Sequence, residues 1–139
     1  MKVLVIVKAT KQSEAGELPT RELLTQMGKF NQDLVEAGVM LAGEGLHPSS
    51  RGMRVRFSSG SPEVTAGPFA QTEELASGFW VWQVRSMEEA VEWIRRSPFR
   101  TSGGEVEIRP IFGPEDFGDR LTPELLERDA QLRARIARH

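Results

Sequence analysis

Two side chains suited to acid–base chemistry lie close together in the segment 42–48, which reads AGEGLHP. Glu44 stands between two glycines, which permit close backbone approach, and a carboxylate held there could act as a general base. The imidazole of His47 changes charge near neutral pH, so a Glu44–His47 pair could shuttle a proton. The structural alternative is that Glu44 bonds the N–H groups of its own loop and His47 is an ordinary exposed histidine.

Four other side chains are candidates for ligand contact. Lys8 ends the first apolar segment, where it could meet an anionic ligand or extend to solvent. Trp80 and Trp82 share one face of an aromatic segment at 78–84 and could wall a pocket for a flat organic ligand. The alternative is that they belong to the core or to a dimer interface, and the same two interpretations apply to Phe69.

Several chemistries are not expected. The 139-residue chain has no cysteine, so it has no disulfide and no thiolate site, and its second histidine, His139, is the last residue and a bystander. His47 and scattered carboxylates do not make a transition-metal or haem site, and the Gly103-Gly104 pair lacks the context of a phosphate loop, so we expect no cofactor. The net charge is −2 with basic and acidic residues interspersed, which does not fit a nucleic-acid partner. We also expect no membrane span and a cytoplasmic location.

The pattern of apolar residues predicts the elements that position these side chains. Thr20 as N-cap and Gly38 as C′ residue bound a first helix, and Ser86 with Glu89 forms a capping box that opens a second. The predicted elements are, in order, a strand at 2–8, a helix at 20–38, a strand at 39–42, a hairpin of strands 53–57 and 63–65, a strand at 78–84, a helix at 86–97 and a strand at 105–111. Two β-α-β units of this kind predict an α+β, ferredoxin-like antiparallel sheet with helices on one face.

The other face of that sheet also carries apolar residues, so we expect it to be covered. A two-fold homodimer with sheets packed face to face is one solution. The alternative is a monomer whose C-terminal helix, capped by Thr122 with Pro123 at its first position, lies on that face. We therefore divide the chain into a domain at 1–112 and a linker with a C-terminal helical extension at 113–139.

The chain resembles the YCII-related family, in particular its DGPF-type branch, over about residues 1 to 112. The resemblance rests on the first strand, Gly43-Glu44-Gly45-Leu46-x-Pro48, Gly67-Pro68-Phe69, the aromatic strand, the helix 87–95 and Val106-Glu107-Ile108-Arg109-Pro110. It implies a ferredoxin-like domain of the dimeric α/β-barrel superfamily. The chain departs from the family where the motif Asp is Ala66 and where a nearby acidic residue is Gln71, followed by Glu73 and Glu74. Either another carboxylate replaces the Asp, or the Asp is a turn former in the family.

Two functional hypotheses follow. The first is a small-molecule-binding protein of YCII type with a pocket between the sheet and the two turns, working as a cofactor-free enzyme through Glu44 and His47. The second is a non-catalytic accessory or regulatory module, associated with a sigma factor as the resemblance implies for the DGPF branch. The loss of the motif Asp at Ala66 adds weight to the second.

Overall fold

The computed structural model describes residues 1–70 and 72–138. Two expectations, for Gln71 and His139, fall on residues outside this description. The strands are β1 (Lys2–Lys8), β2 (Met40–Gly45), β3 (Met53–Arg56), β4 (Glu63–Ala66), β5 (Ala76–Gln83) and β6 (Val106–Pro110). The helices are α1 (Lys11–Glu14), α2 (Arg21–Glu36), α3 (Met87–Arg95), α4 (Phe99–Ser102) and α5 (Pro123–Ala137), with 3-10 turns η1 (Ser49–Arg51), η2 (Thr72–Glu74) and η3 (Pro114–Arg120).

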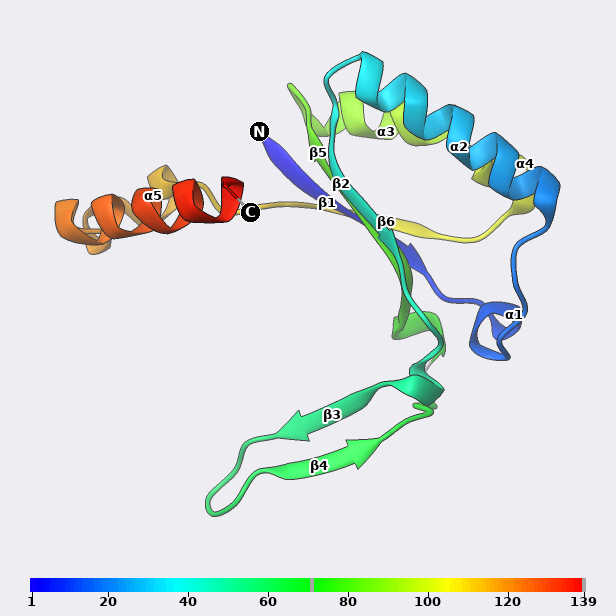
Figure 1. The fold of residues 1–139 in the computed structure, drawn as a ribbon, viewed down its shortest axis with the longest axis horizontal. Helices are drawn as coiled ribbons and strands as arrows, with labels where there is room; N and C mark the ends of the chain where they lie inside the picture. Colours follow the sequence, from blue (N-terminus) through cyan, green and yellow to red (C-terminus); the bar gives the residue numbers. More distant parts are fainter. Residues whose placement is uncertain (71, 139) are drawn as a thin grey trace.

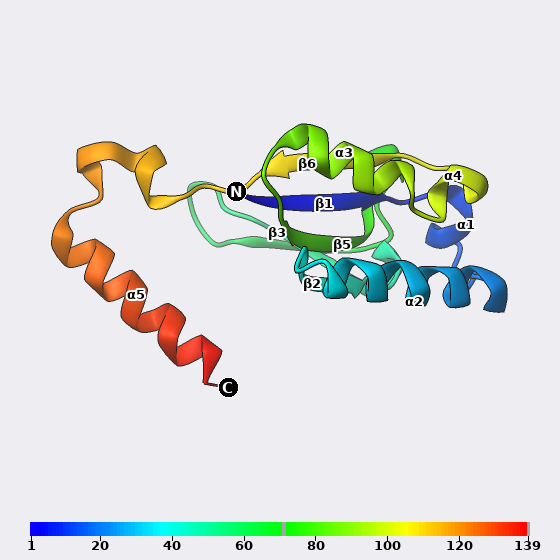
Figure 2. The same cartoon turned by 90° about the horizontal axis from the view of Figure 1, so that it is seen from above.

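Four strands form the main sheet in the order β2-β5-β1-β6, with every neighbouring pair antiparallel. Helices α2 and α3 lie on one face of this sheet, as Figures 1 and 2 show. Because each helix links one edge strand to a central strand, the chain forms two interleaved β-α-β units. The fold is ferredoxin-like and of the α+β class, as the order of the sequence patterns predicts.

Side-chain caps begin the two helices that cover the sheet. The Thr20 hydroxyl accepts from the Leu23 N–H at 3.1 Å, and the Ser86 hydroxyl accepts from the Glu89 N–H at 3.1 Å. The second half of the expected Ser86–Glu89 box differs, because the Glu89 carboxylate accepts from the Arg85 N–H at 2.7 Å. That backbone hydrogen bond, helped by the Arg85 side chain, lowers the pKa of Glu89 against the opposing effect of burial.

The core lies between the sheet and helices α2 and α3. Trp80 and Trp82 point from β5 into it, and Phe30 of α2 meets both rings edge to face, with centroids 5.8 and 6.4 Å away. The Trp80 indole N–H donates to the Asn31 side-chain oxygen at 2.9 Å. The remaining buried apolar residues of this cluster are Val3, Val5, Leu34, Val39, Val84 and Ala90.

The opposite face of the sheet carries no helix formed by the described residues (Figures 1 and 2). Cross-strand pairing places Phe79 beside Ile6 and Val81 beside Leu4 on this face, and all four side chains remain partly exposed. Hereafter we call it the helix-free face. The two-sided apolar character predicted for the first and aromatic strands is therefore present in the structure.

Two elements project from the domain on the side of the helix-free face. The β3–β4 hairpin, predicted as strands 53–57 and 63–65, forms a separate two-stranded sheet whose strand residues are all exposed. Helix α5 stands apart from the sheet in Figures 1 and 2, reached through η3. Its Leu125, Leu132 and Ile136 are exposed, so it does not cover the sheet of its own chain. The alternative in which α5 covers that face is wrong for this chain.

Other differences from the sequence prediction are local. Strand β2 runs on to Gly45, past the predicted end at residue 42, because it keeps its register with β5 as far as Gly78. The predicted loop after β1 contains the short helix α1, with a capping box made by Thr10 and Ser13. Within residues 1–70 and 72–138, no helix has the length and apolar character needed to cross a membrane.

Candidate functional site

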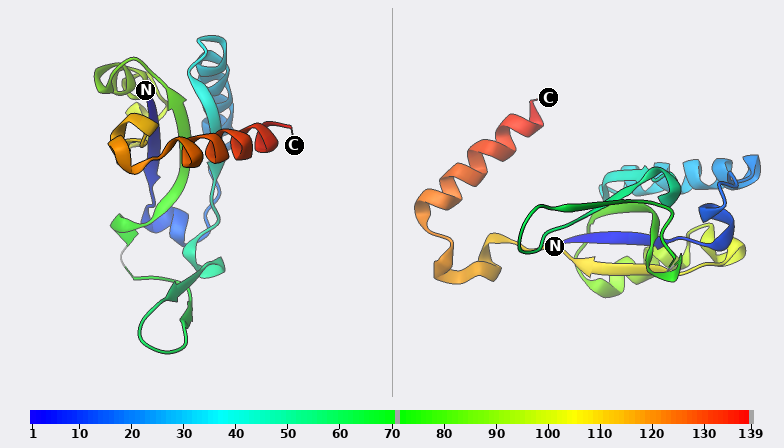
Figure 3. Two further views of the ribbon diagram at one scale, coloured as in Figure 1. Left: turned by 90° about the vertical axis from the view of Figure 1, so that its left-hand side faces the viewer. Right: turned by 90° about the horizontal axis from the view of Figure 1, so that it is seen from below.

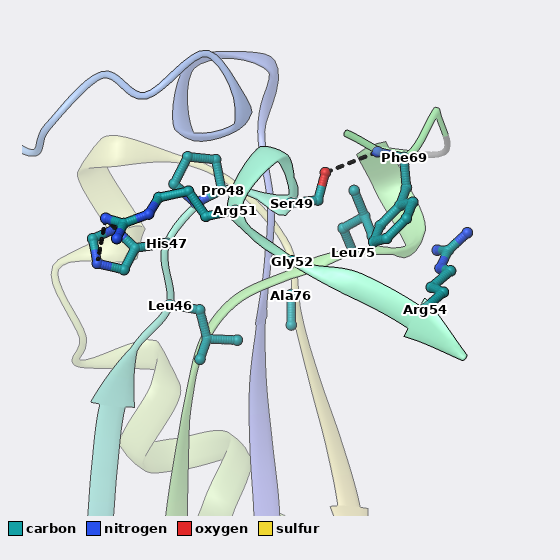
Figure 4. Close-up of a pocket in the computed structure, with 10 residues that line it drawn as sticks. All are labelled: Leu46, His47, Pro48, Ser49, Arg51, Gly52, Arg54, Phe69, Leu75 and Ala76. Atoms are coloured by element: carbon teal, nitrogen blue, oxygen red, sulfur yellow. Dashed lines mark hydrogen bonds between the residues drawn. The ribbon is translucent and has the colours of Figure 1, made fainter. Parts of the chain in front are cut away.

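A pocket of about 300 Å³ lies where strand β2 passes through η1 into the hairpin. Figure 4 shows His47 and Arg51 at one side, Phe69 and Arg54 at the other, and Leu46 and Ala76 between them. Its lining residues are Leu46, His47, Pro48, Ser49, Arg51, Gly52, Arg54, Phe69, Leu75 and Ala76. The lining is mainly apolar with a few polar groups at its rim, and the pocket is open to solvent.

A hydrogen-bonded clip centred on Ser49 holds the pocket together. The Glu14 carboxylate of α1 accepts from the Ser49 hydroxyl at 2.5 Å and from the Ser49 N–H at 2.8 Å. The same hydroxyl accepts from the Phe69 N–H at 3.0 Å. Three segments that are distant in the chain are thus joined at one side chain. We call Glu14, Ser49 and Phe69 the Ser49 clip.

The close approach of two turns accounts for the glycine of Gly67-Pro68-Phe69. A Cβ at Gly67 would lie 1.8 Å from the Ser49 carbonyl oxygen, so no larger residue fits without moving the backbone. The Gly67 N–H also donates to the Gly52 carbonyl at 3.0 Å, next to a cis Gly67–Pro68 peptide bond. This turn leads into Phe69, the residue of the Gly-Pro-Phe motif that lines the pocket.

Ala66, where the family motif has an acid, is exposed at the end of β4 and pairs with Met53 across the hairpin. It does not line the pocket. The carboxylate that bonds across to the turn is instead Glu14, acting through Ser49.

Two guanidinium groups border the pocket, and each rests against a ring. An Arg51 terminal nitrogen lies 3.3 Å from Nδ1 and 3.2 Å from Nε2 of His47. The Arg54 guanidinium carbon lies 3.9 Å from the centroid of the Phe69 ring, a cation–π contact. Within the described residues, neither arginine forms an ion pair.

Glu44 and His47 are separated by the structure. Glu44 pairs with Phe79 across β2 and β5, so its side chain belongs to the helix-free face, and it is exposed. It does not line the pocket, whereas His47 does. Within the described part of the chain, Glu44 takes part in no side-chain hydrogen bond or ion pair. The structure of the single chain therefore does not bring Glu44 and His47 together as the predicted pair.

The glycine before Glu44 has a packing role. A Cβ at Gly43 would lie 2.7 Å from Cδ1 of Trp80 and 2.8 Å from the terminal methyl of Met40. The glycine therefore makes room for the indole of the core.

Lys8, one of the predicted ligand contacts, forms an ion pair within the chain. Its ammonium group lies 3.2 Å from a carboxylate oxygen of Glu107 on β6, and its side chain is 18% exposed. Glu107 in turn faces Ile6, so the ion pair sits on the helix-free face. Lys8 does not line the pocket, and the prediction that it meets an anionic ligand there is not supported in the single chain.

The two tryptophans are core residues. Trp80 is 5% exposed and Trp82 fully buried, and both belong to the core cluster that includes Phe30 of α2 and Ala90 of α3. The prediction that they wall a ligand pocket is corrected accordingly, because neither ring reaches the pocket surface. Phe69 alone among the predicted aromatic contacts lies on the pocket wall.

Sequence reasoning missed four residues of this site, namely Glu14, Ser49, Arg51 and Arg54. The one signal in the sequence was Thr10 followed by Ser13 and Glu14, which is typical of a capped helical turn placing a carboxylate at its end. Nothing in the sequence pattern indicated that this turn faces Ser49. Among the described residues, no group of three or more His, Asp or Glu side chains is arranged to hold a metal ion.

The fold and the pocket describe a small ferredoxin-like domain with a site at the base of a hairpin, a description that many families share. The comparison with protein families is specific: residues 1–115 match the YCII-related domain, and the chain belongs to this family. A curated relative, "Uncharacterized protein R00369" of Rhizobium meliloti (strain 1021), is 32% identical over 106 residues, which are 76% of this chain and 82% of the relative.

Among solved structures, the chain is similar to 5-chloro-2-hydroxyhydroquinone dehydrochlorinase (TftG) from Burkholderia phenoliruptrix AC1100, in complex with 2,5-dihydroxybenzoquinone. The sequence identity is 13% and the TM-score 0.49, over 84% of this chain and 98% of that one.

Proposed function

We propose that this protein binds a small organic anion in the pocket at the base of the hairpin. The observation that carries the proposal is the pair of guanidinium groups, Arg51 and Arg54, which border an apolar surface and have no acidic partner among the described residues. A carboxylate or phenolate could be held by these donors while its apolar part lies on Leu46 and Leu75. Each guanidinium rests on a ring. A ligand anion that binds them would therefore not have to displace a carboxylate of the described residues.

The chemistry we propose for this pocket is proton transfer without a cofactor. The imidazole of His47 could accept the proton of an acidic hydroxyl group on the ligand. The oxygen would keep the electron pair of the broken O–H bond, and Arg51 beside the imidazole would stabilise the resulting oxyanion. Glu44 lies outside the pocket lining, so this proposal assigns the proton to His47 alone.

A binding module without chemistry is the second candidate. It is favoured by the position of Glu44 on the helix-free face and by Ala66 in place of the motif acid. Both candidates need the pocket, and they differ only in what His47 does to a bound acid.

We further propose that the protein is a homodimer whose two copies pack through their helix-free faces. Leu4, Ile6, Phe79 and Val81 support this, because four apolar side chains on one face remain partly exposed and α5 does not cover them. Light scattering after size exclusion should give twice the 15.5 kDa mass of the chain. A mass equal to that of one chain would refute the dimer and leave the pocket proposal standing.

Binding is tested by calorimetry with benzoate and phenol derivatives as probes. Arg51→Gln should weaken binding of the anionic probes by about 10-fold or more, since a hydrogen bond to a charged group contributes roughly 1.5–3 kcal/mol. Arg56→Gln is the matched control, because Arg56 is on the same hairpin but does not line the pocket. Equal binding by both variants would contradict the proposed site.

Proton transfer is tested by the absorbance of a bound nitrophenol, at a pH where the free probe is mainly protonated. If His47 takes the proton, the bound probe should absorb as phenolate in the wild type. His47→Gln should bind the probe without ionising it. A probe that stays protonated in the wild-type complex would favour the binding module.

A further inference from the structure

The pocket at the base of the hairpin has a guanidinium group on each of two opposite sides. Figure 4 places Arg51 with His47 on one side and Arg54 with Phe69 on the other, with apolar side chains such as Leu46 between them. None of the described residues that line the pocket is acidic. The lining therefore offers two separate positive charges with an apolar surface between them.

The turn that carries Phe69 holds Arg54 in place. The Arg54 guanidinium carbon lies 3.9 Å from the centroid of the Phe69 ring. The Phe69 N–H donates to the Ser49 hydroxyl at 3.0 Å, and this hydroxyl donates to the Glu14 carboxylate at 2.5 Å. Stacking uses the face of the planar guanidinium and leaves the N–H donors along its edge free. The second positive charge is thus positioned before a ligand binds, which lowers the entropy lost on binding.

The cross-strand partners distinguish Arg54 from the other arginine of β3. Arg56 pairs with Glu63 across the hairpin, whereas Arg54 pairs with Thr65. Opposite charges in facing positions attract, so the hairpin places an acidic residue opposite Arg56 and a neutral one opposite Arg54. Figure 3 shows the hairpin extending past the end of the sheet strands. The pocket lies at the base of this extension, and Arg54 is the arginine of β3 that lines it.

We propose that the pocket selects a ligand with two anionic groups at opposite ends of a single ring. This inference rests on the proposed function, in which Arg51 and His47 receive the first acidic group. Arg54 binds the second group, and the ring lies on the apolar surface between the two arginines. The volume of about 300 Å³ is at the lower end for small-molecule sites, which favours one ring over a fused ring system.

The positions of the two arginines decide which isomer fits. Two carboxylates on adjacent ring carbons point to the same side, so the ligand can reach only one of the arginines. Carboxylates on opposite ring carbons point in opposite directions, toward Arg51 and Arg54. These residues are three positions apart, so their Cα atoms lie at most about 11 Å from each other. One ring with a carboxylate at each end can bridge two arginine side chains at this spacing, and the pocket therefore prefers para over ortho dianions.

The test is calorimetry with terephthalate, phthalate and benzoate as probes, at about pH 8, where the carboxyl groups of all three are ionised. The ionic strength is held constant because salt screens exposed charges. Terephthalate should bind about 10-fold more tightly than benzoate, since it gains a second charge-assisted hydrogen bond. Phthalate should stay within about 3-fold of benzoate, because its second carboxylate meets no arginine directly. Phthalate carries the same two charges as terephthalate and so controls for net charge.

Variants assign the preference to Arg54. Arg54→Gln should abolish the preference for terephthalate while changing benzoate affinity by less than about 3-fold. Arg51→Gln should weaken the binding of both ligands. Arg56→Gln is the matched control, because Arg56 lies two residues further along β3 and outside the pocket lining, and it should leave all three affinities unchanged. Arg54 and Arg56 are both exposed, so their variants should keep a urea midpoint close to that of the wild type.

Equal wild-type affinity for terephthalate and benzoate, with both weakened by Arg51→Gln, would overturn this inference and leave the proposed function standing. Phthalate binding as tight as terephthalate binding would show attraction by net charge alone and would also overturn it. The same result follows if Arg54→Gln weakens benzoate as much as terephthalate, because Arg54 would then support the pocket in general. If none of the probes bound, the proposed function would fail together with the inference.

Discussion

Replacing Ser49 by alanine tests whether the Ser49 clip holds the candidate site together. The substitution removes the hydroxyl that donates to Glu14 at 2.5 Å and accepts from the Phe69 N–H at 3.0 Å. Glu14 keeps its bond from the Ser49 N–H at 2.8 Å, so one of its two contacts survives. The Phe69 N–H loses the acceptor that ties the Gly-Pro-Phe turn to η1.

The magnitude follows from these two bonds. A hydrogen bond to a carboxylate contributes roughly 1.5–3 kcal/mol and a neutral one about 1 kcal/mol. The clip is partly buried, so water can reach the groups left behind and reduce the loss. We expect Ser49→Ala to lower the free energy of unfolding by about 2 kcal/mol, which is near 1 M in the urea midpoint for a slope of about 2 kcal/mol/M.

Urea unfolding followed by the fluorescence of the buried tryptophans measures the effect. Ser50→Ala is the matched control, since Ser50 is exposed and forms no side-chain hydrogen bond among the described residues. Glu14→Gln keeps an oxygen acceptor but loses the charge, and together with Ser49→Ala it should show a coupling above about 0.5 kcal/mol in a double-mutant cycle. If Ser49→Ala matched Ser50→Ala in its midpoint, the clip would have no part in the stability of the site.

Two further perturbations follow from named contacts. Gly67→Ala places a methyl group 1.8 Å from the Ser49 carbonyl oxygen, so it should lower the free energy of unfolding by about 2 kcal/mol or more. Gly45→Ala is the control, because a methyl group there meets open space, and it should cost less than about 1 kcal/mol in the same urea titration. Glu89 has a pKa below the ordinary 4.5 because its carboxylate accepts the Arg85 N–H. The stabilisation that Glu89 gives is therefore complete above pH 4.5, the pKa expected in the unfolded chain. It is lost as the pH falls through the lower pKa of the folded protein. Glu89→Gln should therefore flatten the fall in stability below pH 4.5 in acid titrations, and an unchanged slope would contradict the cap.

The secondary structure of the domain could be predicted because its signals are local. Apolar alternation at 2–8, the caps at Thr20 and Ser86, and Gly38 after α2 each act within a few residues, and the structure has these elements within a few residues of their predicted ends. Helix α1 escaped notice because a single turn of four polar residues has no apolar period. The extra length of β2 comes from pairing with β5, which depends on residues more than thirty positions away.

The candidate site was harder to predict because it is assembled from distant segments. Glu14 and Ser49 meet across 35 residues of chain, and no spacing rule connects them. Glu44 and His47, three residues apart, looked like a pair, but the end of a strand lies between them. Alternation along β2 sends Glu44 to the helix-free face, while the chain turns beyond Gly45 and His47 joins the pocket. Proximity in sequence was a poor guide here because strand geometry separates side chains that a helix would bring together.

Glu44 nevertheless connects the proposed dimer with the question of function. Cross-strand pairing places Glu44, Phe79, Ile6 and Glu107 in one row across the helix-free face, with a carboxylate at each end. Glu107 has Lys8 as its counter-ion at 3.2 Å, and Glu44 has none within the described part of the chain. A partner packed tightly over the whole row would take Glu44 out of water without compensation, at a cost of several kcal/mol. A dimer through this face must therefore either bring a cation of the partner to Glu44 or leave a wet cavity around it, and in the second case the interface itself would hold a carboxylate in a pocket walled by Phe79.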